Sequence, residues 1–167
     1  MKKKKNTSFL NKWVLKRKIK NFPKDIKLVC ISNWLKKKAL ESSVFKDYDI
    51  EYIPCTLNFN KWKILDKKNS RKILNLPKDK KIILFVSASG TDDYRKGFHI
   101  LKKALKNIVK TDDLHLVIVG RAMKKDLKDL KIENTIYDKF YSGKSDFLNL
   151  IYSSADLLTV PSLIEPF

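Results

Sequence analysis

Short apolar runs and helix-like patterns alternate along most of the chain. The apolar runs are typical of buried strands, and they lie at 26–32, 50–54, 81–86, 114–120, 132–137 and 156–162. Between them, apolar residues recur at the spacing of an amphipathic helix in 33–45, 70–76, 98–110, 123–130 and 145–155. Continuous apolar strands separated by helices predict an α/β fold class, with a Rossmann-like parallel sheet and helices on both faces.

The carboxyl ends of the predicted strands indicate where a ligand would bind. Right-handed crossovers bring these ends to one edge of a parallel sheet, and open α/β sheets bind ligands there. Three loops follow the strands at 87–97, 120–122 and 162–167. The residues in these loops that could contact a ligand are Lys96, Gly97, Gly120, Arg121 and Glu165.

These loop residues suit a phosphorylated sugar ligand. Glycine lets backbone N–H groups come close to a ligand, and the start of the predicted helix at Phe98 attracts phosphate. Lys96 stands just before that helix, so its ammonium and the helix end can share one phosphate. Glu165 can accept hydrogen bonds from the hydroxyls of a ribose or hexose. Phosphate donors beside a hydroxyl acceptor indicate a nucleotide-sugar site.

Each of these residues also has a simpler structural interpretation. A Lys-Gly pair before a helix is common in exposed loops, and Gly120-Arg121 could form a plain helix-entry turn. Neither the P-loop pattern nor Gly-x-Gly-x-x-Gly is present. The Asp-Tyr-Asp at 47–49 precedes a strand and is interpreted as a turn. Thr-Asp-Asp occurs in loops at 91–93 and 111–113 without the His or Cys partners that a metal site would prefer.

The composition adds charge to this picture. Hydrophobic residues make up 43% of the 167 residues, which argues against disorder, and the formal net charge is +19. Among the 37 basic residues only four are arginines, whereas sites for phosphate or nucleic acid favour the fork of Arg. The lysines are spread over every segment, which is typical of a background coding bias toward lysine. The alternative is a non-catalytic basic module that binds nucleic acid or an anionic membrane.

The amino-terminal segment could contact a membrane. Phe9, Leu10, Trp13 and Val14 fall on one helical face beside many lysines. This arrangement fits an interfacial helix on anionic lipid, and it fits a helix packed on a domain equally well. The sequence pattern leaves both possibilities open.

Two features indicate a cytoplasmic protein. Basic residues at Lys12 and 16–18 interrupt the first apolar stretch, so no signal-peptide core forms. Cys30 and Cys55 lie in apolar stretches without metal-ligand spacing, and we expect both to be reduced core residues.

Several segments, taken in order from residue 26 to the end, resemble a known family. They read “CISNWL”, “IEYIPCTLNFNKW”, “DDYRKGFHIL”, “LVIVG” and “YSSADLLTVPSLIEPF”. This series is similar to family 4 glycosyltransferases of the GT-B fold, also described as glycosyl transferases group 1. The resemblance implies transfer of a sugar, with retention, from a nucleotide-diphosphate sugar to a glycan or lipid-linked acceptor, without a metal. Such enzymes typically build bacterial surface glycans such as lipopolysaccharide at the inner face of the membrane, and the resemblance implies no nucleic-acid partner.

The resemblance also implies a division of the chain. Residues 1–54 would hold a basic segment, the last strand and helix of an acceptor domain, and a linker. Residues 55–167 would form the nucleotide-sugar-binding domain, a GT-B C-terminal domain that is incomplete at its end. The second glutamate of the family's Glu-x7-Glu motif would lie beyond Phe167, so we expect weak donor binding and little transfer by this chain alone.

The roles of single residues follow from the same resemblance. Lys96 matches the lysine that binds the donor diphosphate, and Glu165 matches the first glutamate, which faces the donor sugar. These two are the expected catalytic residues. The resemblance places Ser89-Gly90 where the family has an arginine, and Arg95 is the candidate to substitute for it. The expected donor-binding residues are Arg95, Lys96, Gly97, Gly120, Arg121, Ser162, Glu165 and Phe167, and backbone groups near 137–140 would read the base.

Overall fold

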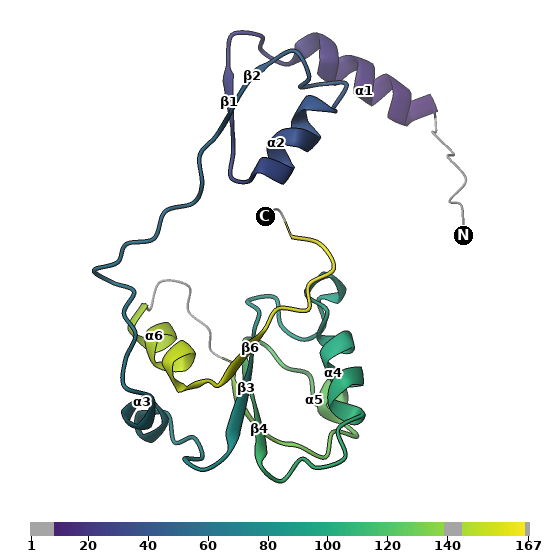
Figure 1. The fold of residues 1–167 in the computed structure, drawn as a ribbon. Helices are drawn as coiled ribbons and strands as arrows, with labels where there is room; N and C mark the ends of the chain where they lie inside the picture. Colours follow the sequence, from purple (N-terminus) through teal and green to yellow (C-terminus); the bar gives the residue numbers. More distant parts are fainter. Residues whose placement is uncertain (1–8, 139–144, 166–167) are drawn as a thin grey trace. The chain divides into compact units, whose positions relative to one another are not determined.

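The chain folds into two compact units. The structure, a computed structural model, describes residues 9–138 and 145–165. The units divide between Thr56 and Leu57 (Figure 1). The assignment of residues 1–54 to the end of an acceptor domain stays a prediction.

The smaller unit contains a pair of parallel strands and two helices. In chain order these are α1 (Phe9–Asn21), β1 (Lys27–Cys30), α2 (Asn33–Leu40) and β2 (Asp49–Tyr52). The hydroxyl of Ser32 caps α2 by accepting a hydrogen bond from the N–H of Leu35 at 3.0 Å. Buried Cys30, Tyr48 and Ile50 form the core of the unit, and partly buried apolar side chains pack against them.

The larger unit is an α/β sheet domain, as the apolar runs predict. Its elements are α3 (Lys67–Ile73), β3 (Lys81–Val86), the 3-10 turn η1 (Tyr94–Lys96), α4 (Phe98–Lys106), β4 (Leu114–Val119), α5 (Lys124–Leu127), β5 (Glu133–Tyr137), α6 (Ser145–Ser154) and β6 (Leu157–Thr159). The strand order is β5-β4-β3-β6, and every neighbouring pair is parallel. The predicted fold class is therefore confirmed for this unit.

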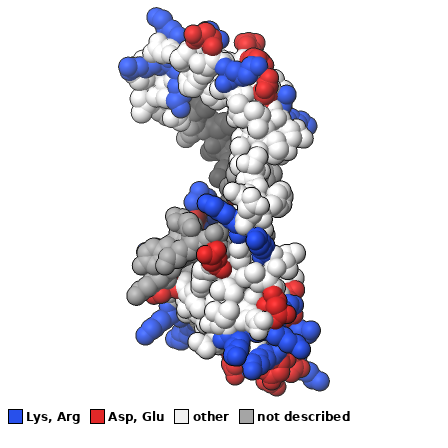
Figure 2. All heavy atoms as spheres, turned by 90° about the vertical axis from the view of Figure 1, so that its left-hand side faces the viewer, with Lys and Arg blue, Asp and Glu red and all other residues white. Residues whose placement is uncertain are grey.

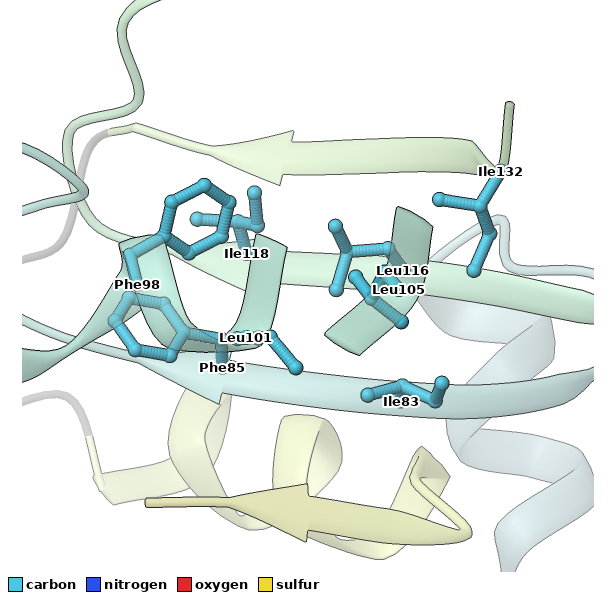
Figure 3. Packing of buried hydrophobic residues seen from close by; sticks show 8 residues of the cluster. All are labelled: Ile83, Phe85, Phe98, Leu101, Leu105, Leu116, Ile118 and Ile132. Carbon is cyan, nitrogen blue, oxygen red and sulfur yellow. The ribbon is translucent and has the colours of Figure 1, made fainter. Parts of the chain in front are cut away.

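Helices cover both faces of the four-stranded sheet. On one face, Phe98, Leu101 and Leu105 of α4 pack on alternate residues of β3 and β4, as Figure 3 shows. On the other face, Ile151 of α6 and the residues that follow α3 pack on the intervening positions of the same strands. The central strands are apolar at consecutive positions because both of their faces are buried.

Some element bounds differ from the sequence prediction because local contacts override the apolar pattern. The helix predicted for 98–110 ends at Lys106, and Ile108, which lies within the predicted range, is 38% exposed. The helix predicted to start at residue 70 begins at Lys67, since the carboxylate of Asp66 caps it by accepting from the N–H of Asn69. Cys30 is buried as expected, whereas Cys55 is exposed, so the prediction of a core position for Cys55 was wrong.

Basic side chains are dispersed over the visible surface. On the face that Figure 2 shows, lysine and arginine side chains lie on both units with acidic side chains among them. This dispersal agrees with the background bias inferred from the sequence. Within the described residues, no helix has the length and apolar character needed to cross a bilayer.

Candidate functional site

Two loops at the carboxyl edge of the sheet approach each other closely through glycines. Gly120 follows β4 with φ 116°, and a Cβ atom there would lie 1.9 Å from the carbonyl oxygen of Ser87. Gly90 has φ 88°, and its Cβ would lie 2.2 Å from the carbonyl oxygen of Arg121. Only glycine fits both the left-handed backbone and these approaches. The loops after β3 and β4 are therefore packed backbone to backbone.

A short turn presents Lys96 at the start of α4. The carboxylate of Asp93 caps η1 by accepting from the N–H of Arg95 at 3.0 Å. Gly97 follows with φ 72°, which ends the turn and lets α4 begin at Phe98. As the sequence predicts, Lys96 stands directly before a helix whose first turn favours anions.

The loop after β6 brings Glu165 to the same turn. A Cβ on Gly97 would lie 2.0 Å from the carbonyl oxygen of Pro161, so the loop backbone passes against this glycine. The N–H of Leu163 donates to the carbonyl oxygen of Arg95 at 2.8 Å. These two contacts fix the β6 loop on η1 and set the distance between Lys96 and Glu165.

Lys96 and Glu165 form an ion pair, although 69 positions separate them in the chain. The Nζ atom of Lys96 donates to Oε1 of Glu165 at 2.7 Å, and both side chains are about one-third exposed, at 34% and 31%. This contact, a hydrogen bond from Ser162 and the charge of Arg95 hold the pKa of Glu165 below its usual value. The carboxylate is thus ionised at neutral pH and remains accessible to solvent.

The two arginines predicted to bind a donor also have carboxylate partners. The guanidinium of Arg95 donates twice to Asp93, at 2.9 and 3.1 Å. Arg95 and the hydroxyl of Ser89 lower the pKa of Asp93 to about 2. Arg121 donates to Asp92 at 3.0 Å across the neighbouring loop.

From sequence, Asp92 and Asp93 are predicted only to be loop residues without metal partners, so their pairing with the arginines was missed. The pairing of Asp93 with Arg95 did have a local signal. A carboxylate two positions before an arginine can cap a turn and reach the guanidinium at the same time. The pairing of Asp92 with Arg121 had no such local signal.

Other predicted site residues lie partly or wholly outside this cluster. The hydroxyl of Tyr137 donates to the carbonyl oxygen of Leu74 at 2.6 Å, so this side chain ties the end of β5 to the segment after α3. Residues 139 and 140 of the predicted base-reading segment, and Phe167, lie outside the described residues. In the described ranges no group of three or more His, Cys, Asp or Glu side chains is placed to hold a metal ion.

Comparison with known proteins identifies the family. The sequence profile described as Glycosyl transferases group 1 matches residues 66–167, which include the whole four-stranded sheet and the Lys96–Glu165 pair. The chain therefore belongs to this glycosyltransferase family. The fold agrees with this family. The parallel sheet has helices on both faces, and the structural neighbours of the chain are GT-B glycosyltransferases.

Individual relatives support the same assignment. An uncharacterized glycosyltransferase of Methanocaldococcus jannaschii is 35% identical over 108 residues, which is 61% of this chain and 26% of the relative. A glycogen synthase of Mycoplasma mobile is 31% identical over 144 residues, which is 84% of this chain and 30% of the relative. The chain thus spans less than a third of the length of these relatives.

Solved structures share the fold. A sucrose-phosphate synthase from Thermosynechococcus elongatus aligns with a TM-score of 0.67 and 25% identity, over 84% of this chain and 36% of that one. A glycosyltransferase from Rickettsia africae aligns with a TM-score of 0.69 and 20% identity, over 90% of this chain and 42% of that one.

Proposed function

We propose that residues 57–165 supply the donor side of a glycosyltransferase site, which binds a nucleotide-diphosphate sugar at the carboxyl edge of the sheet. The observation that carries the proposal is the Lys96–Glu165 pair at the start of α4. It sets a phosphate-binding group beside a hydroxyl acceptor. Membership of a glycosyltransferase family favours this function over a non-catalytic basic module.

The chemistry of the site follows from these two side chains. The ammonium of Lys96 and the first turn of α4 stabilise negative charge that builds on the diphosphate as it leaves the sugar. Glu165 accepts hydrogen bonds from sugar hydroxyls and so fixes the orientation of the anomeric carbon. Lys96 and Glu165 bind each other in this structure, so donor binding separates the two charges. Both are partly exposed, and a rearranged surface ion pair costs about 1 kcal/mol or less.

The finer properties of the reaction are part of the same proposal. We expect retention of the anomeric configuration, a glycan or lipid-linked acceptor of bacterial surface-glycan synthesis, and no metal. The matched segments cover only 26% and 30% of the lengths of the two relatives. We therefore expect residues 1–167 to bind a nucleoside diphosphate weakly and to transfer little sugar without an acceptor-binding part.

Calorimetric titration of the purified chain with UDP, GDP and ADP tests donor binding. We expect saturable binding of at least one of these ligands, with a parallel rise in Tm. Lys96→Met should weaken this binding about tenfold or more, because the substitution removes the charge beside the diphosphate. Lys103→Met, an exposed position near the end of α4, is the matched control and should leave binding unchanged. Equal binding by the two variants would reject the proposal.

A second candidate function concerns α1. This helix has no buried residue, and Phe9, Leu10 and Trp13 are 87%, 61% and 49% exposed. Its 13 residues include five basic and no acidic side chains. We propose that α1 contacts an anionic membrane surface, with its aromatic residues at the interface and its basic residues near lipid headgroups. This would place the protein at the cytoplasmic face of a membrane.

Sedimentation with lipid vesicles tests this contact. Vesicles that contain phosphatidylglycerol should bind the chain, and neutral phosphatidylcholine vesicles should bind it weakly or not at all. Trp13→Ala should reduce binding, whereas Trp34→Ala, which removes a 50% exposed tryptophan from α2, should not. Equal losses for both variants would contradict a specific role of α1.

A further inference from the structure

Each of the three cations predicted to bind a donor is paired with a carboxylate in this structure. Arg95 binds Asp93, Lys96 binds Glu165, and Arg121 binds Asp92, at distances between 2.7 and 3.1 Å. The formal charges of these six side chains cancel. This balance contrasts with the net charge of +19 of the whole chain. At the carboxyl edge of the sheet, carboxylates of this chain thus bind the cations that an anionic ligand would approach.

The two aspartates bind their arginines with different geometry. Asp93 binds Arg95 through both carboxylate oxygens, and its side chain is 11% exposed while that of Arg95 is 69% exposed. Asp92 binds Arg121 through one oxygen, and Arg121 is 71% exposed. A carboxylate offers the guanidinium the same fork of oxygens that a phosphate offers. The aspartates and a diphosphate would therefore compete for the same donors.

We propose that Asp92 and Asp93 set the affinity of this site, because they hold Arg121 and Arg95 until a nucleoside diphosphate displaces them. The inference rests on the proposed donor-binding function. A ligand gains less from cations that are already paired than from free ones, so the aspartates weaken binding of the donor. They also speed the release of the nucleoside diphosphate that remains after sugar transfer. Asp92 and Asp93 thus favour turnover over tight binding.

The chain supplies a matched control for this proposal. Thr-Asp-Asp occurs at 91–93, after β3, and again at 111–113, immediately before β4. Because β3 and β4 are parallel, these two sequences lie at opposite edges of the sheet. Substitutions in the second sequence make the same change in net charge far from the site. Asp93→Asn keeps a side-chain oxygen that can cap η1, so this variant retains the turn.

Titration of UDP, GDP and ADP into the wild-type chain and into Asp92→Asn, Asp93→Asn and Asp113→Asn tests the inference. We expect Asp92→Asn and Asp93→Asn each to tighten binding of the nucleoside diphosphate by about two- to fivefold, the range for an exposed ion pair. The tighter binding should show a steeper loss with added salt, and Asp113→Asn should bind like the wild type. Asp92 caps no helix, so its variant tests the idea even if Asp93→Asn is unstable.

The possible failures are distinguishable. Unchanged or weaker binding in both site variants, with normal binding by the wild-type chain, would overturn the role of the aspartates and leave the donor site intact. An equal gain in Asp113→Asn would also overturn it, because the effect would then belong to net charge. Absence of binding in all four proteins would reject the donor site itself.

Discussion

Two clusters of ion pairs lie at opposite edges of the same four-stranded sheet, and they differ in burial. At the amino edge, Arg71 of α3 is buried and binds the carboxylate of Asp156 at 2.6 Å. Its other donors meet backbone carbonyl oxygens of Ser154, Lys78 and Lys80. At the carboxyl edge, the pairs around Lys96 have at least one partner that is about one-third exposed or more.

This difference teaches which charges stabilise the fold and which can serve a ligand. A buried guanidinium that makes four hydrogen bonds is costly to disturb, because its partners would lose those bonds away from water. Exposed pairs are worth little and exchange partners easily. The first cluster joins α3, β3 and the start of β6. The second leaves its cations accessible to an incoming anion.

The largest expected effect is on the buried cluster. Arg71→Ala should lower the free energy of unfolding by about 3 kcal/mol, because it leaves Asp156 and three carbonyl oxygens without this donor. Arg95→Ala, at the other edge, should lower it far less, because the guanidinium of Arg95 is exposed. Denaturant unfolding measures both. Similar losses for the two variants would contradict the contrast between the clusters.

The second expected effect is a loss of stability at low pH, which arises from Asp156 in the buried cluster. Burial alone would raise the pKa of Asp156, but hydrogen bonds from the N–H of Ile82, from Lys67 and from Arg71 outweigh it and set the pKa at about 2. A carboxylate with a lowered pKa stabilises the fold above its unfolded pKa of about 3.9, and this stability is lost as the pH falls toward 2. We expect a loss of roughly 2 kcal/mol over this window. Asp156→Asn should flatten that part of the stability profile, and an unchanged profile would show that Asp156 does not carry it.

An effect of similar size concerns the backbone beneath the exposed cluster. Gly97→Ala places a Cβ in a left-handed conformation and against the carbonyl oxygen of Pro161. We expect a loss of about 2 kcal/mol in the free energy of unfolding, because the β6 loop must move away from η1. Binding of a nucleoside diphosphate should weaken as well. A variant with wild-type stability and binding would show that the two loops need no close contact.

The smallest effect on stability is expected for Glu165. Glu165→Gln keeps the shape of the side chain and removes one charge of a partly exposed ion pair. The free energy of unfolding should therefore change by less than about 0.5 kcal/mol. We propose that Glu165 holds the donor sugar, so the variant should lose the extra thermal protection that a nucleotide sugar gives over the free nucleoside diphosphate. Equal extra protection in variant and wild type would contradict this role.

The sequence by itself determined the sheet, its helices and the place of the candidate site. The strand predicted for 81–86 coincides with β3, and the predicted position of Lys96 before a helix is confirmed. These features depend on periodicity and on glycine, which are legible within a few neighbouring residues. Helix ends were predicted less well, as at Lys106, because capping and packing contacts decide where a helix stops.

Only the tertiary structure decided which charges meet. Nothing local in the sequence pairs Arg71 with Asp156, 85 positions away, or Lys96 with Glu165. Those contacts depend on the order of strands in the sheet and on close approaches such as that of Gly97 to Pro161. Charge pairing is a property of distance in space, whereas a sequence pattern records only distance along the chain.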